Sequence, residues 1–452
     1  MKAGINKDRT YQTFEGIGAS GAWWAQVVGG WNHTDEKSGM PVNQKIAQLL
    51  YSKDSGIGMT IYRYNLGGGS KNSLSSVFYN KNRMAESFDD NGKYDWTRDE
   101  NAVNMMRLCV NEGADSVVFF SNSPPERLTK NHKSCLDKPM RSNLARKNEN
   151  AFCDYLLDCA EHFIEEGIPV KHISPVNEPL WIWTEKNGQE GCHYAPHEVY
   201  SLLKKLSAKI KERKSLEGVK ISACENGDIR WFNRTYTLMV LMNKRIREAC
   251  DGIDVHSYCL PIPVPFLNNR VGFLKRYRKF LDIFFPSVKV TMSEWCHMNG
   301  GRDAGMDSAL ECAKIMFEDF TILGASSWQH WIAVSEVDYC DGLIYINEDD
   351  KTFYTTKRLY VTGNFSKYIP VGATRVEAFT DDKDIKTVAF TGDGRTVQIF
   401  INHTNENKRL DNTFGKKVLT ALTDKDNDLT ERELTENEEI TLPARSVLTI
   451  VY

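Results

Sequence analysis

The chain has 452 residues, of which 41% are hydrophobic and 26% charged, and its net charge is −3. This length allows one large domain plus a smaller one, and the composition is that of an ordinary globular protein. Without a basic surplus we expect no nucleic-acid partner, and no apolar run approaches the roughly 20 residues of a membrane-spanning helix.

The cysteines and the first residues bear on where the protein works. Eleven cysteines are scattered from Cys109 to Cys340, without the spacing of a disulfide framework and without a CxxC metal motif. Residues 1–16 have neither the apolar stretch nor the cleavage site of a signal peptide. We therefore expect a cytoplasmic protein; the alternative is a secreted protein whose leader has been removed. The sequence leaves the oligomeric state open.

In chain order, short runs rich in β-branched and aromatic residues alternate with longer amphipathic stretches. Strands are predicted at Phe14–Ala19, Met59–Leu66, Ser116–Ser121, His172–Val176, Lys220–Cys224, Ile253–Tyr258, Lys289–Ser293 and Ala325–Trp331. Helices are predicted at Asn43–Leu50, Asp99–Glu112, Glu149–Glu166, Pro196–Lys214 and Met306–Leu323. This alternation predicts an α/β fold, a (β/α)8 TIM barrel over residues 12–358. The alternative, a doubly wound open sheet, would carry a Gly-rich phosphate turn whose spacing Gly16–Gly21 does not match.

The pattern changes after about Tyr360. Short strands are predicted at Val376–Phe379, Thr387–Phe390, Thr396–Asn402, Lys417–Thr423, Glu439–Leu442 and Val447–Tyr452. Turn signals such as Gly392-Asp393-Gly394 separate them, and no long helical pattern occurs. We expect an associated antiparallel β-sandwich domain over residues 359–452, to which residues 1–11 add a strand.

Glutamates stand where the fourth and seventh predicted strands end, in Asn177-Glu178-Pro179 and Ser293-Glu294-Trp295. The C-terminal ends of the strands meet at one mouth of a (β/α)8 barrel, so the two carboxyl groups are expected to face each other there. Glycosidic bond hydrolysis needs such a pair, one acid for the leaving oxygen and one carboxylate for the anomeric carbon. Taken singly, either glutamate could equally be a solvated loop residue or part of an ion pair.

Other candidate residues lie near the same strand ends. Tryptophans such as Trp24 and Trp295 suit the apolar faces of sugars, although packing in the core or a lid is the alternative. Glu225, which follows strand five, either accepts a sugar hydroxyl or is a solvated loop residue. His256 lacks a defined set of metal-ligand partners, so a hydrogen-bonding role near the sugar is favoured over a metal site.

An ordered set of motifs resembles glycoside hydrolase family 30, in the clan of retaining enzymes. The set comprises Phe14–Ser20 with Trp23-Trp24, Tyr62–Asn65, Ser121–Pro125, Asn177–Pro179, His256–Tyr258, Ser293–Cys296 and Ser327–Trp331. The closing Leu442–Val447 is similar to the last strand of that family's side β-sandwich. The resemblance covers essentially the whole chain.

The resemblance implies a role for each matching residue. Glu178 would be the acid/base and Glu294 the nucleophile. Asn177 would donate to the sugar 2-hydroxyl, and Arg63 would hold Glu294 ionised. The remaining matched residues expected at the substrate are Asn122, Tyr258, which would hydrogen-bond near Glu294, and Trp331, which would floor the −1 subsite. A retaining enzyme would hold its carboxyl groups about 5–5.5 Å apart.

The tandem tryptophans and the Trp-Gln-His-Trp motif look most like the family branch that acts on β-1,6-linked galactan. Xylan, β-1,6-glucan, β-fucosides and glucosylceramide are the rival substrates, and two departures from the family pattern, at Glu126-Arg127 and Ser257, border the sugar site. A catalytically dead carbohydrate-binding barrel would lack a glutamate or Arg63, and all are present. A metal-dependent hydrolase would need a His/Asp cluster, which we do not find with workable spacing. We therefore expect an enzyme with a carbohydrate substrate, no cofactor and no metal.

Overall fold

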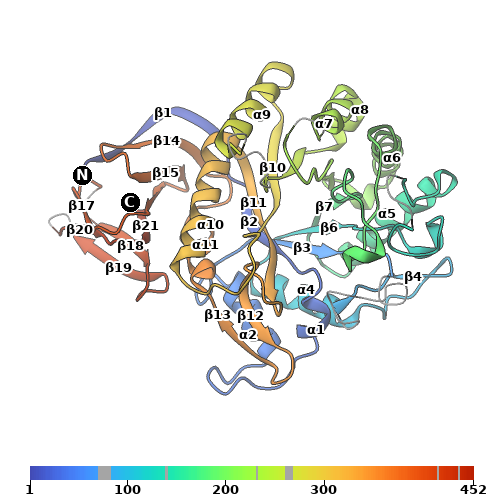
Figure 1. The fold of residues 1–452 in the computed structure, drawn as a ribbon, viewed down its shortest axis with the longest axis horizontal. Coiled ribbons are helices and arrows are strands. Elements are labelled where there is room, and N and C mark those ends of the chain that lie inside the picture. The colour runs from blue at the N-terminus through green and yellow to red at the C-terminus, as the bar shows by residue number, and fades with distance from the viewer. Residues whose placement is uncertain (70–82, 138–140, 231–232, 260–267, 415–416, 436–437) are drawn as a thin grey trace. The chain divides into compact units, whose positions relative to one another are not determined.

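The computed structural model describes residues 1–69, 83–137, 141–230, 233–259, 268–414, 417–435 and 438–452 (Figure 1). The chain folds into two compact units. Unit one comprises Met1–Gly18, Gln48–Thr60 and Cys296–Tyr452, and unit two comprises Ala19–Ala47 and Ile61–Trp295. This division differs from the predicted domain limits, 12–358 for the barrel and 1–11 plus 359–452 for the sandwich, which stay a prediction.

Unit two is built on parallel strands. They are β3 (Ile61–Asn65), β6 (Ser116–Phe120), β7 (Val170–Ser174), β8 (Lys220–Ile221), β9 (Gly252–His256) and β10 (Lys289–Trp295). Strand β6 pairs with β3 and β7, β7 with β8, and β9 with β10, all in parallel. Isolated parallel bridges, Ile221 to Cys250 and Asn226 to Val255, join the segments of β8 and β9. Strands consecutive in this list therefore lie side by side in the same direction.

Helices alternate with these strands. They are α1 (Ala25–Val28), α4 (Glu100–Glu112), α5 (Glu149–Glu165), α6 (Pro196–Lys209), α7 (Asn233–Met242), α8 (Lys244–Ala249) and α9 (Arg270–Phe284), with α2 (Val42–Tyr51) crossing from one unit into the other. In α5 the apolar residues Phe152, Leu156 and Phe163 recur at helical spacing and are buried, because one face of an amphipathic helix packs on the core. Gly113 ends α4 at φ 134°, a conformation that favours glycine.

Each of the eight strands predicted for the barrel has a counterpart, with ends shifted by a few residues. The eight counterparts are β2 (Gly16–Ser20), the six strands of unit two and β11 (Ala325–Ser335). The predicted helix Pro196–Lys214 is too long, because α6 ends at Lys209 and 3-10 turns follow at Ile210–Glu212 and Lys214–Leu216. The predicted helix Met306–Leu323 is an α-helix as far as Glu318 and continues as a π-helix over Asp319–Leu323.

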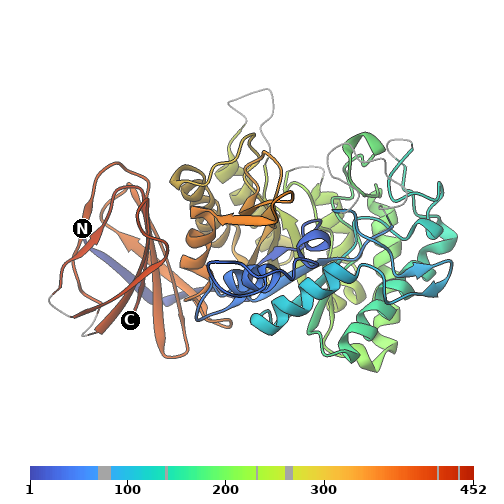
Figure 2. The same ribbon diagram turned by 90° about the horizontal axis from the view of Figure 1, so that it is seen from below.

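Unit one contains an antiparallel sheet in the order β1-β14-β15-β16-β21-β18-β19. These strands are β1 (Ala3–Thr13), β14 (Thr374–Thr380), β15 (Ile385–Gly392), β16 (Arg395–Asn402), β21 (Ser446–Val451), β18 (Lys417–Thr423) and β19 (Thr430–Thr435). A second pair, β17 (Lys408–Leu410) with β20 (Ile440–Leu442), shares one apolar core with this sheet through side chains such as Phe400, Leu410 and Leu442. The N-terminal strand β1 pairs with β14, as predicted, and Figure 2 shows both termini among these strands.

The remainder of unit one includes a helix that the sequence pattern does not reveal. Strand β11 pairs in parallel with β12 (Gly342–Asn347), which pairs with β13 (Thr352–Thr355). Helix α10 (Met306–Glu318) is followed by α11 (Lys357–Ser366) in the region where no helical pattern was expected. Because α11 buries polar as well as apolar side chains, Arg358, Thr362 and Asn364 among them, it has no amphipathic stripe.

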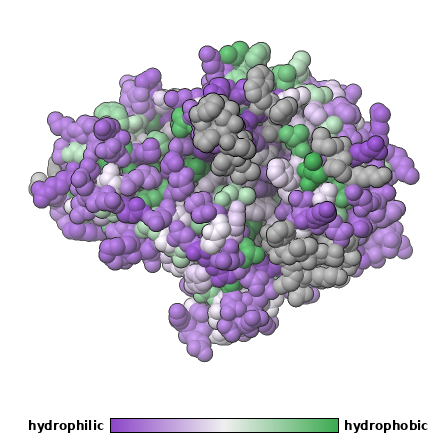
Figure 3. Space-filling model, viewed as in Figure 1, coloured by the Kyte–Doolittle hydropathy of each residue, from purple (hydrophilic) through white to green (hydrophobic). Residues whose placement is uncertain are grey.

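The surface is predominantly hydrophilic on the face shown in Figure 3, where hydrophobic residues occur in small groups. Among the described residues, no helix has both the length and the apolar character needed to cross a bilayer.

The core of the antiparallel unit offers a test of the fold. Phe400 on β16 is fully buried, so Phe400→Ala should lower the free energy of unfolding by about 3–5 kcal/mol, measured by urea denaturation. Phe379 on β14 of the same sheet is 56% exposed, and Phe379→Ala should change it by less than about 0.5 kcal/mol. Equal effects would contradict the described packing.

Candidate active site

Glu178 and Glu294 come together in unit two. Glu178 follows β7 at φ 43°, in the left-handed region, and its backbone N–H donates to the carbonyl of Glu225 at 2.9 Å. Glu294 stands within β10 and is 5% exposed. One carboxylate oxygen of Glu178 and one of Glu294 lie within 4.8 Å of each other. The structure thus brings together the two glutamates that the strand ends indicated.

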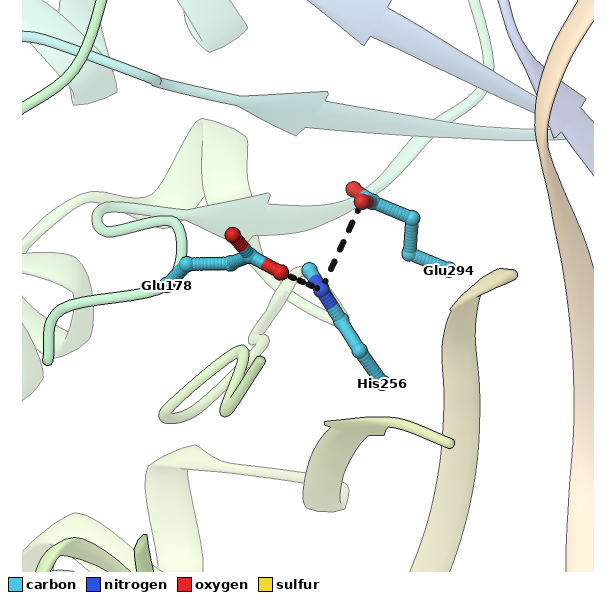
Figure 4. A group of neighbouring side chains, drawn as sticks. All are labelled: Glu178, His256 and Glu294. Carbon is cyan, nitrogen blue, oxygen red and sulfur yellow. Dashed lines mark hydrogen bonds and ion pairs between the residues drawn. The ribbon is translucent and has the colours of Figure 1, made fainter. Parts of the chain in front are cut away.

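His256, at the end of β9, stands beside both glutamates (Figure 4). Its Nδ1 lies 2.9 Å from Oε1 of Glu178 and 3.5 Å from Oε1 of Glu294, while its Nε2 lies 3.1 Å from Oε2 of Glu225. Burial lowers the pKa of His256, but the charge of Glu294 and the hydrogen bonds to Glu178 and Glu225 outweigh it and raise that pKa to about 10. The imidazole is therefore a buried cation that donates from both nitrogens.

Arg63 on β3 is the second buried cation. Its Nη1 donates to Oε2 of Glu294 at 2.7 Å, and its Nη2 donates to Oδ1 of Asn177 at 3.0 Å. The guanidinium carbon lies 3.8 Å from the centroid of the Phe120 ring. The hydroxyl of Tyr258 donates to Oε1 of Glu294 at 2.9 Å, so both oxygens of Glu294 accept hydrogen bonds.

Burial and charge oppose each other at Glu294. Burial raises the pKa of Glu294, the cations His256 and Arg63 lower it, and the neighbouring Glu178 raises it again. The net direction is upward, because the two cations do not fully offset burial and the charge of Glu178.

Glu225 is the residue whose place differs most from what its sequence position suggested. It is fully buried, so it is neither a solvated loop residue nor positioned to accept a sugar hydroxyl. Its Oε1 accepts from the hydroxyl of Ser174 at 2.9 Å and lies 3.6 Å from Nη2 of Arg63. Its Oε2 accepts from His256 and from the hydroxyl of Ser293. Glu225 is therefore an internal counter-ion of the site.

The charge state of Glu225 follows from these neighbours. Burial raises the pKa of Glu225, but Arg63, His256 and the hydrogen-bond donors lower it to about 2. The nearby Asp254 behaves in the opposite way, because burial and the charge of Glu225 raise the pKa of Asp254 well above its ordinary value. Glu225 is thus ionised at neutral pH, whereas its charge and burial favour the protonated form of Asp254.

The predicted sugar-binding tryptophans occupy different environments. Trp24 is 1% exposed and its indole N–H donates to the Ser20 carbonyl at 2.9 Å. It is therefore a packing residue, and its prediction as a substrate-binding residue is not supported. Trp295 directly follows Glu294 and is 4% exposed. Trp331 lies on β11 in unit one and is partly exposed.

A buried polar chain, which sequence reasoning missed, holds the segment after β3. Asn122, predicted at the substrate, is 2% exposed and donates to Oδ1 of Asn65 at 3.3 Å. Asn65 donates to Oε1 of Glu190 at 3.0 Å, and the N–H of Gly68 donates to Oε2 of Glu190 at 3.1 Å. Glu190 is fully buried in a loop, where no strand end marks it as special. Its place beside Gly191 in a Gly-rich loop was the one available signal.

Glu178, His256 and Glu294 also have the spacing of a metal-binding group. A histidine ligates a metal only as the neutral imidazole, whereas the pKa of His256 is raised to about 10. Without a metal ion, these three side chains therefore form a hydrogen-bonded charge cluster, with Nδ1 of His256 2.9 Å from Oε1 of Glu178.

An acid and a carboxylate at this spacing are what hydrolysis of a glycosidic bond requires, and on this α/β scaffold they define a glycoside hydrolase. The family model described as O-Glycosyl hydrolase family 30 matches residues 1–238 and 275–345. The chain belongs to glycoside hydrolase family 30.

Relatives agree with this membership. The chain is similar to an endo-beta-1,6-galactanase of Hypocrea rufa, with 25% identity over 399 residues, 81% of this chain and 74% of that protein. It is similar in structure to a conserved exported protein from Bacteroides fragilis, with TM-score 0.85 and 24% identity over 100% of both chains. A further similar structure is the catalytic domain of GH30 xylanase C from Talaromyces cellulolyticus, with TM-score 0.75 and 18% identity over 100% of this chain and 99% of that one.

The substitution Glu225→Gln should remove the negative charge that lies next to Arg63 and His256. Since an opposite charge at hydrogen-bond distance shifts a pKa by about one to three units, the pKa of His256 should fall by that amount in Glu225→Gln. NMR titration of labelled histidines measures it. The matched control is Glu190→Gln, a fully buried carboxylate bonded instead to Asn65 and Gly68. An unchanged His256 would show that Glu225 does not set its charge.

His256 and Glu225 make the free energy of unfolding depend on pH in two separate pH ranges. Because the pKa of His256 is raised, its contribution is complete below about pH 6.5 and is lost as the pH rises toward 10. Because the pKa of Glu225 is depressed, its contribution is complete above about pH 4.3 and is lost as the pH falls toward 2. Denaturant unfolding across pH should show both declines. In Glu225→Gln, the alkaline decline should still begin near pH 6.5 but should be smaller and end at lower pH, and the acid decline should shrink.

Gly227 leaves room for the Glu178 side chain. A Cβ at this position would lie 2.7 Å from Oε1 of Glu178, the oxygen that His256 holds at 2.9 Å. Gly227→Ala should displace that carboxyl and lower kcat by about 10–100-fold with little change in the unfolding midpoint. Gly300→Ala, where a Cβ meets nothing within 4 Å, is the control. Wild-type kcat in Gly227→Ala would contradict the described position of Glu178.

Proposed function

We propose that the protein hydrolyses β-glycosidic bonds with retention, through a covalent glycosyl intermediate on Glu294. The observation that carries the proposal is the separation of Glu178 and Glu294, whose oxygens approach within 4.8 Å. Retaining enzymes hold their carboxyl groups roughly 5–5.5 Å apart, whereas inverting enzymes need roughly 6.5–9.5 Å to admit a water molecule. The intact pair with Arg63 also argues against a dead, purely sugar-binding barrel.

In the first step, the protonated Glu178 gives its proton to the glycosidic oxygen as Glu294 attacks the anomeric carbon. The carboxylate that forms on Glu178 then accepts the N–H of His256, whose Nδ1 lies 2.9 Å away. Arg63 orients Asn177 by donating to its Oδ1, so the Nδ2 of Asn177 remains to donate to the sugar 2-hydroxyl.

In the second step, the Glu178 carboxylate takes a proton from water as the water oxygen attacks the anomeric carbon. The bond between the sugar and Glu294 breaks, and Glu294 leaves as a carboxylate. Arg63 and Tyr258, which donate to its two oxygens, stabilise the returning charge.

For the substrate, we propose β-1,6-linked galactan. The similarity to an endo-beta-1,6-galactanase supports this choice. Trp24 no longer contributes to the argument, because its ring packs in the core. A panel of galactan, xylan, β-1,6-glucan, β-fucosides and glucosylceramide tests the choice, and release from another member but none from galactan would refute it.

We propose that β2, β3 and β6–β11 close into the (β/α)8 barrel, with domain limits at 12–358 and 359–452 plus 1–11. The side-by-side parallel order within unit two and the likeness to family structures support the barrel. We also propose a cytoplasmic location, which the eleven free cysteines support.

Replacing each of the two glutamates by glutamine should reduce activity in a different way. Glu294→Gln should lose activity on every substrate. Its loss should exceed the about 10²–10³-fold decrease that follows removal of one transition-state hydrogen-bond donor. With dinitrophenyl glycosides, whose leaving group needs no proton, Glu178→Gln should still release dinitrophenolate in a fast first turnover. Later turnovers should be slow, because the second step uses the Glu178 carboxylate. Time-resolved NMR of the wild-type reaction should show the β-anomer first. Turnover by Glu294→Gln, or an α-anomer formed first, would contradict the mechanism.

A further inference from the structure

The loop that follows Glu178 exposes consecutive apolar side chains. Leu180 is 37% exposed, Trp181 51% and Ile182 37%. Among the tryptophans that the structure describes, Trp181 is the most exposed, and the others are buried or partly buried. Because burying an aromatic ring is favourable, a ring held in solvent three residues after Glu178 suggests that a ligand covers it.

Trp181 and its neighbour Trp183 have different surroundings. Trp183 is 8% exposed and its ring lies against Gly191, where a Cβ would come within 2.2 Å of the indole. The two indole centroids are 6.2 Å apart, with planes inclined at 52°. Packing therefore accounts for Trp183, whereas it does not account for Trp181.

Backbone contacts fix the position of Trp181. Its N–H donates to the carbonyl of Glu178 at 2.9 Å, and its own carbonyl lies 3.3 Å from Nδ1 of His193. The N–H of Tyr194 donates to the Pro179 carbonyl at 2.9 Å. The exposed ring is thus anchored to the acid/base residue by one turn of chain.

The role of Glu178 as the acid indicates which of the two sugars would lie next to the Trp181 ring. Glu178 protonates the oxygen of the leaving group, so the leaving sugar lies next to Glu178 and the sugar that is transferred lies over Glu294. We propose that Trp181, flanked by Leu180 and Ile182, is the binding surface for the leaving-side sugar, whose apolar C–H face stacks on the indole. This inference rests on the proposed function, which it extends to a second sugar unit.

The same surface would serve a sugar acceptor in the second step. The bond between Glu294 and the anomeric carbon breaks while the acceptor hydroxyl oxygen bonds to that carbon, and the hydroxyl proton passes to the Glu178 carboxylate. Water gives hydrolysis instead. A sugar held on Trp181 therefore raises the share of transfer.

The test compares Trp181→Ala and Trp181→Phe with Phe284→Ala, which removes a ring that is 59% exposed on α9. The β-glycosyl fluoride of the sugar found in the substrate panel has no leaving-side sugar. Trp181→Ala should leave its hydrolysis and the unfolding midpoint unchanged, lower kcat/KM on the polysaccharide about tenfold, and lower the transfer-to-hydrolysis ratio with the disaccharide as acceptor. Trp181→Phe should retain most of the kcat/KM on the polysaccharide and most of the transfer-to-hydrolysis ratio, and Phe284→Ala should retain both in full.

Three results would overturn the inference. The first is that Trp181→Ala cleaves the polysaccharide and transfers sugar as well as the wild-type protein does. The second is that Trp181→Ala loses as much activity on the glycosyl fluoride as on the polysaccharide, which would make Trp181 a support of the catalytic loop. The third is that the wild-type protein shows no transfer. Failure of the wild-type protein on every glycoside, including the fluoride, would instead refute the proposed function itself.

Discussion

Two carboxyl groups in a buried site repel each other when both are charged, and the arrangement around Glu178 and Glu294 depends on how that repulsion is offset. Arg63 and His256 provide two buried cations within hydrogen-bond distance. Buried cations are costly unless they are paired, and Glu225 lies 3.6 Å from Nη2 of Arg63 and 3.1 Å from Nε2 of His256. Together with the charge of Glu294 and the hydrogen bond to Glu178, this third carboxylate keeps His256 charged inside the protein.

The charge balance of this cluster has a chemical consequence. With Arg63 and His256 positive and Glu225 negative, one ionised catalytic carboxylate makes the cluster neutral, whereas two would leave it negative in a buried site. The raised pKa of Glu294 follows the same logic, since its cationic neighbours do not fully offset burial. One proton shared by Glu178 and Glu294 is what a double displacement needs, since one group must donate while the other attacks.

Sequence patterns located what depends on strand periodicity and strand ends. The positions of the strands and of the two glutamates could be predicted from apolar runs that stop at recognisable residues. The approach of Glu178 to Glu294 could be predicted in the same way. The environment of Glu225 did not follow, because its burial depends on the joining of β8 to β9 and on hydroxyls from Ser174 and Ser293. Trp24 was misjudged for a similar reason: Trp23 at φ 69° turns the chain, and the next indole meets the Ser20 carbonyl.

Burial separates two kinds of residue around the reacting bond. The groups that carry charge, Arg63, Glu225 and His256, are fully buried on or just after strands, where packing limits their movement and low polarity strengthens their interactions. Trp181 is on an exposed loop, so its replacement should cost little stability and should alter which sugar is held next to Glu178. A relative could therefore change its leaving-side sugar at Trp181 without disturbing the proton on the catalytic pair, whereas any change at Glu225 must be offset within the buried cluster.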